Sequence, residues 1–324
     1  MKILFCGFQH GHILGLYTSV KNRSDVEIVA CIEKDANKKA ELSKSMGIEF
    51  DDRSYDYWLT QDVDIVAVGS EYGVRGEITI KALTAGKHVI TDKPVCTRRA
   101  ELDEITRLTK EKGLKLACML DLRYMPSAVT AKRILDSGRL GKVHNVSFTG
   151  QHCLGYGTRP EWYFAEGMHG GTVNDLAIHG VDLVKHLTGL AIEKVNAVRT
   201  WNSYAYKTPD FKDCATFMAE LTGGVGLLAD VSYSAPSQVF SMPTYWDFKI
   251  WCDKGLLTFC ATKDDVLIYE EGHPETQIEK GAEAVGDYMT DLLNEIKSGD
   301  SAFTDSVLFS TSSTLAVQEL ADKE

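Results

Sequence analysis

Four residues on one predicted helix have the types and spacing to do chemistry together. The segment 170–187 ends just before a glycine, and its apolar residues recur at helical intervals. Placing residues at 100° intervals puts Asp175, His179, Asp182 and His186 in one row. Apolar side chains cover most of the remaining circumference, so this helix should be buried. The polar row must then be paired internally or line a cavity.

Three interpretations of this row stay open from the spacing alone. An aspartate four residues before a histidine, as Asp175 is before His179, can orient an imidazole and stabilise its charge during general acid–base catalysis. Two histidines and two aspartates at these spacings could instead hold a metal ion. The third interpretation is structural: a buried, satisfied polar network or the exposed edge of an amphipathic helix.

A lysine in a restricted turn is the second candidate. Asp92-Lys93-Pro94 directly follows a predicted strand. A lysine at the carboxyl end of a parallel strand points to the edge where doubly wound sheets bind ligands. Pro94 restricts Lys93 to extended geometry and so fixes its direction. From the turn alone, Lys93 is equally well explained as a solvated surface residue.

The first predicted strand runs into a glycine-containing turn, 7–12, with the sequence GFQHGH, and a helical pattern follows. A dinucleotide-binding turn needs glycine so that the backbone can turn tightly and approach the pyrophosphate at a helix N-terminus. The usual GxGxxG fingerprint is absent, because Gly7 and Gly11 are the only glycines in this turn. This motif alone therefore predicts a turn more strongly than a cofactor site.

An acidic residue strengthens the cofactor interpretation. Glu33 ends the second predicted strand, about 20 residues beyond Gly11, where a carboxylate accepts hydrogen bonds from the adenosine ribose. A carboxylate there would repel a 2′-phosphate, so NAD is favoured over NADP. The adjacent Lys34 leaves NADP binding possible.

The elements that must position these residues change character along the chain. Over the first 120 residues short apolar runs alternate with helical segments that stop at glycine. This alternation predicts βαβ units and a doubly wound parallel sheet, the Rossmann fold. The predicted strands are 2–6, 26–32, 63–68, 87–91 and 114–120, and the predicted helices include 36–46, 76–85 and 100–112.

Longer strands follow a helix near 127–137. Turn-like separators between them predict a large, mainly antiparallel open sheet, covered by two final helices near 284–297 and 304–322. The sequence therefore predicts an α/β protein with a Rossmann domain, 1–121, and a C-terminal α/β domain, 122–324. The strands predicted in the second domain are 143–149, 192–200, 214–220, 226–233, 246–252 and 256–260.

Composition excludes several classes of protein. A formal net charge of −11 over 324 residues argues against a nucleic-acid partner or an anionic membrane surface. No segment approaches the ~20 apolar residues of a membrane span. The eight cysteines are scattered without a CxxC pair, which favours a reduced, cytoplasmic protein.

Taken together, these stretches resemble the glucose–fructose oxidoreductase, inositol dehydrogenase and MocA-type family (Gfo/Idh/MocA). The likeness covers nearly the whole chain, and the combination of the motifs is more specific than any one of them. The stretches are the turn 7–12, the run 82–94 (ALTAGKHVITDKP), the segment 122–126 (LRYMP), the junction 134–141 and the helix that begins at Gly170-Gly171.

The resemblance implies an NAD(P)-dependent oxidoreductase that transfers a hydride between the nicotinamide and a secondary alcohol. In the family the lysine matching Lys93 lies between nicotinamide and substrate hydroxyl, the histidine matching His179 is the acid–base, and Asp175 supports it. The Rossmann contacts to NAD are implied for Gly7, Phe8, Gln9, His10, Gly11, His12, Glu33, Lys34, Ser70, Asp92 and Lys93.

Family members mostly act on sugars, inositols and related polyols, and their open sheet commonly forms a homodimer or homotetramer interface. We therefore expect a small-molecule sugar or polyol substrate and an oligomer. Aromatic side chains stack on sugar faces, and polar ones bind hydroxyls, although the same residues would also suit ordinary packing. The expected substrate-binding residues are Arg123, Tyr124, His152, Arg159 and Trp162, with Tyr156 as a further candidate.

The chain departs from the family pattern at four positions. Asp92 replaces the usual glutamate before Lys-Pro, and Arg75 stands where many members have a histidine. Gln9 and His12 replace the second and third fingerprint glycines, which puts the pyrophosphate contacts in doubt.

Other functions compatible with the sequence are an NAD-using lyase or glycosidase with transient oxidation and a non-catalytic dinucleotide sensor. A metal enzyme built on the polar helix row is the least favoured, and no metal is expected.

Overall fold

The computed structural model describes residues 1–237, 242 and 245–323. The chain divides into two compact units, one of residues 1–119, 165–170 and 288–311, the other of 120–164, 171–287 and 312–324. The first unit therefore takes in two segments from beyond residue 121, and the division into domains 1–121 and 122–324 stays a prediction. The predicted α/β fold class is confirmed.

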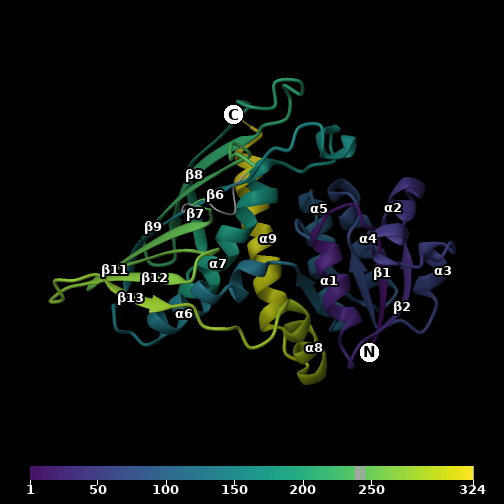
Figure 1. Cartoon of the computed structure of the whole chain (residues 1–324), viewed down its shortest axis with the longest axis horizontal. Coiled ribbons are helices and arrows are strands. Elements are labelled where there is room, and N and C mark those ends of the chain that lie inside the picture. Colours follow the sequence, from purple (N-terminus) through teal and green to yellow (C-terminus); the bar gives the residue numbers. More distant parts are fainter. Residues whose placement is uncertain (238–241, 243–244, 324) are drawn as a thin grey trace. The chain divides into compact units, whose positions relative to one another are not determined.

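A five-stranded parallel sheet forms the centre of the first unit (Figure 1). Its strands are apolar on both faces, as the sequence pattern predicts for a sheet covered by helices on each side. The order β2-β1-β3-β4-β5 reverses direction at β1, so the carboxyl ends of β1 and β3 form the switch point where such sheets bind ligands. The strands are β1 (Lys2–Cys6), β2 (Glu27–Ile32), β3 (Ile65–Val68), β4 (His88–Thr91) and β5 (Leu116–Cys118).

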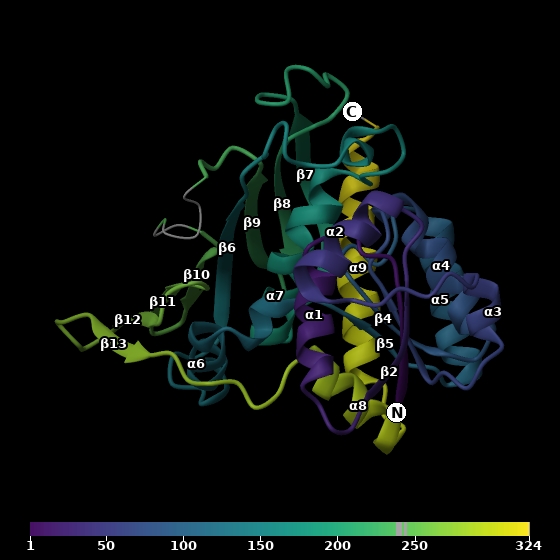
Figure 2. The same ribbon diagram turned by 45° about the vertical axis from the view of Figure 1, so that its right-hand side comes forward.

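Helices pack on both faces of this sheet (Figure 2). Helices α1 (His12–Lys21) and α8 (Tyr288–Ser298) bury their apolar sides against one face, in a core cluster that includes Phe5 and Met289. Helices α4 (Tyr72–Thr84) and α5 (Arg99–Lys112) pack together on the other face. Helices α2 (Ala36–Met46) and α3 (Tyr55–Leu59) complete the unit.

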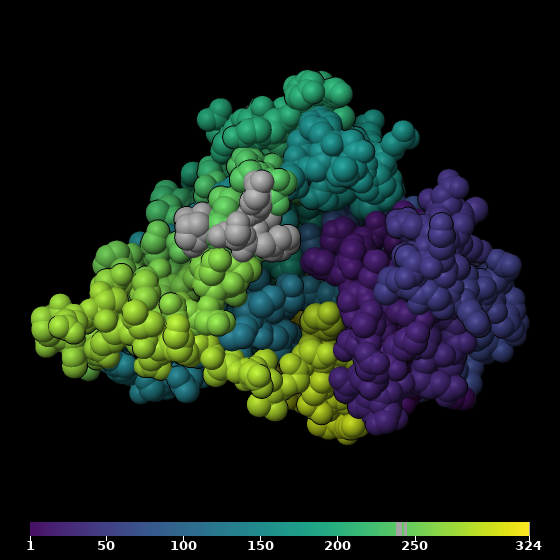
Figure 3. All heavy atoms as spheres, viewed as in Figure 1, coloured from purple at the N-terminus to yellow at the C-terminus, as the bar shows by residue number. Residues whose placement is uncertain are grey.

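The second unit is built on an eight-stranded sheet in the order β13-β12-β11-β10-β6-β9-β8-β7. The β6–β9 pair is parallel and the other pairs are antiparallel. The hairpin of β12 and β13 forms one edge of the sheet, and its tip is exposed to solvent (Figure 3). The strands are β6 (Val143–Gln151), β7 (Ile192–Trp201), β8 (Cys214–Leu221), β9 (Val225–Ser232), β10 (Asp247–Cys252), β11 (Gly255–Cys260), β12 (Asp265–Glu270) and β13 (Gln277–Lys280).

One face of the second sheet is covered by α6 (Pro126–Asp136) and α7 (Ile178–Thr188). Close packing there depends on Gly180, because a Cβ at this position would overlap the ring of Phe148. Shorter elements precede these helices: η1 (Asp121–Tyr124), η2 (Glu161–Phe164) and the π-helical turn η3 (Val173–Ala177). Helix α9 (Ala302–Ala321) begins in the first unit and ends in the second.

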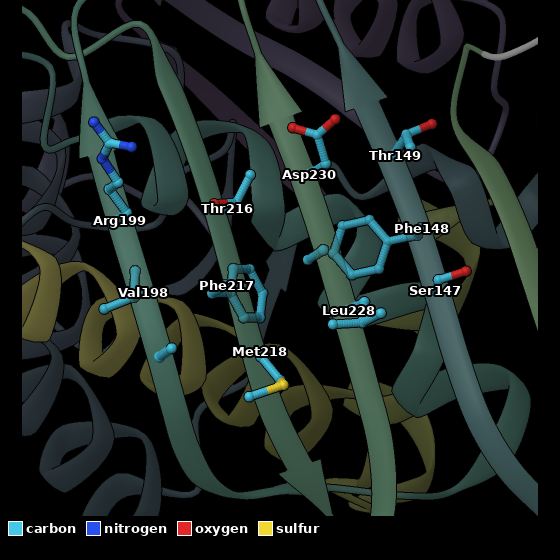
Figure 4. A pocket seen from close by; sticks show the side chains of 12 residues that line it. Ser147, Phe148, Thr149, Val198, Arg199, Thr216, Phe217, Met218, Leu228 and Asp230 are labelled. Atoms are coloured by element: carbon cyan, nitrogen blue, oxygen red, sulfur yellow. The ribbon is translucent and has the colours of Figure 1, made fainter.

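The opposite face of this sheet has no covering helix among the described residues. Several large apolar side chains are more than two-fifths exposed there, including Met218, Leu228 and Trp251. Strands β6–β9 form a shallow hollow of about 430 Å³ on this face (Figure 4). Within the described chain, no helix is long and apolar enough to cross a membrane.

Candidate active site

The glycine turn after β1 has the geometry of a phosphate-binding loop. Gly7 has φ +84°, and a Cβ there would overlap Ser70, so only glycine fits. Gly11 has an ordinary φ of −65° and lies directly before α1. A Cβ at Gly11 would meet no other part of the chain within 4 Å, so the backbone at this position is not crowded by packing. The turn therefore fits a dinucleotide pyrophosphate, which binds backbone N–H groups at such a position.

Not every residue of this turn can contact a cofactor through its side chain. Phe8 is 2% exposed and packs in the core against Phe5, Tyr17 and Phe50. Its contribution to a cofactor site is thus limited to the backbone. The backbone N–H of Gln9 donates to Gly69 O at 2.8 Å, which ties the turn to the end of β3.

Glu33 is placed at the end of β2, and its carboxylate is already bonded to backbone. One oxygen accepts from the N–H of Phe8 at 2.6 Å, and the other from those of Lys34 and Asp35 at 2.7 and 2.9 Å. Glu33, Lys34 and Ser70 line a pocket of about 340 Å³. Glu33 therefore both fixes the glycine turn and faces the space where the resemblance places adenosine ribose.

Asp92 is the centre of a buried polar cluster at the end of β4. It is fully buried, with His10 Nδ1 2.7 Å from one oxygen and His12 Nδ1 3.3 Å from the other. Burial opposes ionisation of Asp92, but His10, Arg75 and His12 outweigh it and hold the pKa of the carboxyl well below its usual value. Burial lowers the pKa of His10 to about 4, so its imidazole is neutral near pH 7.

The same cluster has the ligand atoms for a cation. His10, His12 and Asp92 bring three such atoms within 4.8 Å of one another, a grouping that sequence analysis did not single out. The guanidinium of Arg75 lies 3.5 Å from Asp92, however, and Lys93 is the next residue along the chain. These two positive charges oppose a bound cation.

Lys93 is 3% exposed and its ammonium lies 5.8 Å from the centre of the Tyr72 ring. The guanidinium of Arg75 lies 4.4 Å from the centre of the same ring, and the rings of His10 and His169 lie 5.4 and 5.9 Å from it. Lys93 is thus held in an aromatic and charged setting rather than solvated. This placement differs from the surface lysine that the turn alone would also have allowed.

In the second unit His179 lies on α7, 3% exposed. Its Nδ1 is 3.6 Å from a carboxylate oxygen of Asp121, and its ring meets the Trp246 indole at 5.4 Å and 63°. Trp246 is buried with φ +52°, an uncommon conformation for a bulky residue. Sequence analysis missed Asp121 and Trp246, since neither residue carries a motif.

Asp175 lies in the π-helical turn that precedes α7 and is fully buried. One oxygen accepts a hydrogen bond from Tyr163 at 2.7 Å and another from Tyr233. Burial, followed by the charge of Asp175, raises the pKa of Tyr163 well above its usual value, so the phenol keeps its proton and donates it. That Asp175 orients His179 stays a prediction. The structure shows that Tyr163 and Tyr233 hold Asp175 in place.

In the C-terminal half of the polar row, Asp182 has a structural partner, Arg123. Arg123 Nε donates to Asp182 at 2.5 Å and a second guanidinium nitrogen bonds the other oxygen, with both side chains buried. Asp182 is therefore engaged by a cation, and Arg123, predicted to bind substrate, makes this internal pair. Burial, and then the charge of Arg123, lowers the pKa of His186 to about 4.

This shift gives a pH-dependent stability. Because His186 binds its proton more weakly when folded than when unfolded, the unfolded chain takes up more protons between pH 6.5 and about 4. Stability should fall as the pH drops through that window, with His186 contributing on the order of 1–2 kcal/mol of the loss. The free energy of unfolding, measured in urea, should differ less between pH 7 and pH 4.5 in His186→Gln than in wild type. An unchanged difference would contradict the assignment.

Three of the remaining residues predicted to bind substrate, His152, Arg159 and Trp162, contact aromatic rings. The ring of His152 contacts Trp246 at 5.7 Å, so the two histidines, His152 and His179, meet the same indole. Arg159 donates to the backbone oxygens of residues 153 and 154 and stacks over Tyr163 at 4.3 Å. Trp162 packs on Tyr163, and Tyr124 ends η1. The structure thus brings His152 and His179 to one indole and places Arg159 and Trp162 on one tyrosine.

Comparison with known proteins identifies the family. Residues 1–119 match the oxidoreductase family with an NAD-binding Rossmann fold, and residues 128–258 match the GFO/IDH/MocA C-terminal domain. The chain belongs to the Gfo/Idh/MocA oxidoreductase family, and the predicted membership is confirmed. Its N-terminal part is an NAD(P)-binding Rossmann domain.

Individual relatives are distant. Levoglucosan dehydrogenase of Pseudarthrobacter phenanthrenivorans is 28% identical over 172 residues, which are 50% of this chain and 43% of that protein. The chain spans about half the length of the curated relatives it matches. A solved structure from Erwinia carotovora atroseptica superposes with a TM-score of 0.88 at 21% identity, over 99% of this chain and 98% of that one. The structure of levoglucosan dehydrogenase in complex with NADH and levoglucosan superposes with a TM-score of 0.82 at 18% identity, over 99% of this chain and 97% of that one.

Proposed function

We propose that this protein is an NAD-dependent dehydrogenase that oxidises a secondary alcohol of a sugar, inositol or related polyol. The observation that carries the proposal is the turn before α1, where only glycine fits at position 7, in a segment that matches an NAD-binding Rossmann fold. The resemblance assigns the catalytic roles to Lys93 and His179. Relatives named as levoglucosan, D-xylose and scyllo-inositol dehydrogenases support the substrate class.

The proposed chemistry divides the work between two side chains. A bound nicotinamide would accept the hydride from the alcohol carbon. His179 takes the hydroxyl proton, and the nearby Asp121 carboxylate favours the imidazolium that forms. The Lys93 ammonium donates to the substrate oxygen and stabilises its developing negative charge. Tyr163 and Tyr233 each donate a hydrogen bond to Asp175 and fix its carboxylate in the turn that precedes α7.

The first test is direct. Purified protein with NAD is offered a panel of sugars, inositols and polyols, and NADH formation is followed at 340 nm. Turnover of at least one member supports the proposal. Products that form without net NADH would indicate redox-neutral chemistry, and nucleotide binding without turnover of any panel member would indicate a sensor.

Cofactor choice should depend on Glu33. Glu33→Ala removes a carboxylate that faces the pocket and leaves three backbone N–H groups without their acceptor. We expect the affinity for NAD, measured by calorimetry, to fall about 10- to 100-fold, because the lost hydrogen bonds are worth about 1–3 kcal/mol. The affinity for NADP should fall less, because the variant no longer repels the 2′-phosphate. Glu41→Ala, an exposed carboxylate on α2, is the control. Equal NAD and NADP affinities in the wild type would contradict the preference.

An oligomer through the open face of the second sheet is part of the proposal. Exposed apolar groups on that face, including Leu228 and Trp251, would gain from burial against a second copy. Sedimentation velocity should give a dimer or tetramer, and Leu228→Asp should shift it toward monomer. A wild-type monomer at tens of micromolar would remove this part.

A further inference from the structure

Arg75 is a fully buried cation that no part of the proposed reaction uses. It lies in the first turn of α4 with no exposed surface. A charge in the interior is costly unless it is paired and hydrogen-bonded, and an apolar residue of similar size is often at least as stable. The contacts that Arg75 makes therefore indicate what it is retained for.

Those contacts join the ends of two neighbouring strands. Nε donates to the backbone oxygen of Ser70, after β3, at 2.8 Å. Nη1 donates to the backbone oxygen of Lys93, after β4. Nη2 lies 3.5 Å from the Asp92 carboxylate. The three nitrogens of the planar guanidinium thus each face a different oxygen acceptor. A lysine ammonium cannot reproduce this fixed geometry.

A shared ring extends this arrangement to the Lys93 side chain. The Tyr72 ring has the Arg75 guanidinium 4.4 Å and the Lys93 ammonium 5.8 Å from its centre. Tyr72 is itself fully buried, so the ring is fixed by packing. Arg75 thus constrains Lys93 at its backbone oxygen, and both cations lie against the same packed ring.

We propose that Arg75 is the positioning residue for Lys93: it fixes the Asp92–Lys93–Pro94 turn against the end of β3 and so aims the Lys93 ammonium. This inference rests on the proposed function for its catalytic consequence, but the placement of Lys93 can be measured without any substrate. Arg75 is not a catalytic residue, since it is fully buried and its contacts end on the protein itself.

The first experiment measures the Lys93 amine in the protein without substrate. Wild type, Arg75→Lys and Arg75→Met are labelled for short times with acetic anhydride, and acetylation at Lys93 is followed by peptide mass spectrometry. Lys93 is 3% exposed, so slow labelling is expected in the wild type. Release of the turn should raise the Lys93 rate at least about tenfold in Arg75→Met, and less in Arg75→Lys, which keeps the charge but not the fork.

A matched control separates positioning from general stability. Lys115 is also a buried cation of the first unit, 4% exposed, and it bonds Gly299 O and Ser301 Oγ. Lys115→Met should lower the urea midpoint without changing the labelling of Lys93. Wild-type Lys93 labelling in both Arg75 variants would overturn the proposal, as would equal acceleration in Lys115→Met.

The catalytic consequence is read on any substrate that the panel yields. A misaimed group costs on the order of 100-fold in rate, so Arg75→Met should lower kcat by about that factor with KM and NADH affinity within threefold. Arg75→Lys should recover part of kcat. If no substrate is found, the labelling result still decides the placement of Lys93, and only the proposed function fails. If a substrate is found and Arg75→Met keeps the wild-type kcat once the rate is corrected for its unfolded fraction, Arg75 has only a structural role.

Discussion

Replacing His179 with alanine should lower kcat for alcohol oxidation by about 10²–10⁴-fold, the contribution typical of a positioned general acid–base. Removal of the imidazole leaves the hydroxyl proton without an acceptor at this position, whereas the Rossmann turn is untouched. NADH affinity, measured by fluorescence, should therefore stay at its wild-type value. The loss should appear in kcat far more than in KM, because the proton is transferred in the transition state.

The control for this prediction is His144→Ala. His144 is an exposed histidine of the same unit, at the start of β6, and it pairs with Asp253. Its loss should leave kcat unchanged. Undiminished hydride transfer in His179→Ala would remove the acid–base assignment, and a parallel loss in His144→Ala would point to general damage of the unit.

Replacing Lys93 with methionine should lower kcat/KM by about 10²–10³-fold, the cost of removing one preorganised donor to a developing oxyanion. Methionine keeps much of the side-chain length and loses the charge. Lys93 lies 3% exposed over Tyr72, so the apolar replacement should fold. Stopped-flow measurement of NADH formation would separate a slowed chemical step from slowed product release.

Lys112→Met is the matched control, because Lys112 is a lysine at the end of α5 that bonds Thr84 O at the surface. Lys93→Arg should not keep the activity, since the planar guanidinium differs in shape from the lysine ammonium. Wild-type kcat/KM in Lys93→Met would exclude the proposed role and leave Lys93 as a structural cation.

Much of the fold could be predicted from periodicity. Helix α2 was predicted with its bounds, 36–46, because its stop signal is physical: Gly47 adopts φ +65°, which glycine takes without strain. Strands β12 and β13 were missed. Strand β13 is at the edge of the sheet, and its half-exposed, charged residues carry little of the apolar pattern on which such predictions depend. Strand β12 is paired on both sides and buries Val266 and Ile268, so its alternating pattern was present in the sequence and was overlooked.

The candidate site was harder to predict in detail. A spacing of 100° per residue assumes a regular α-helix, but Asp175 lies in a π-helical turn. Its bonds to Tyr163 and Tyr233 come from remote parts of the sequence, as does the contact of Trp246 with His179. Arg75 was noted only as a departure from the family. Its pairing with Asp92 depends on how the start of α4 packs beside the end of β4, which local patterns do not encode.

The parallel pairing of β6 with β9 has a consequence for how the second unit assembles. Asn145 pairs with Gly226, and the segment between the two strands, 152–224, is the connection that closes the pair. That connection carries Tyr163, Asp175 and His179. Pairing of the two inner strands must wait for a long loop to close, which makes it slow and dependent on compact structure within the loop. We expect the residues of the candidate site to be folding determinants too: mutations that loosen α7 should slow refolding as well as turnover.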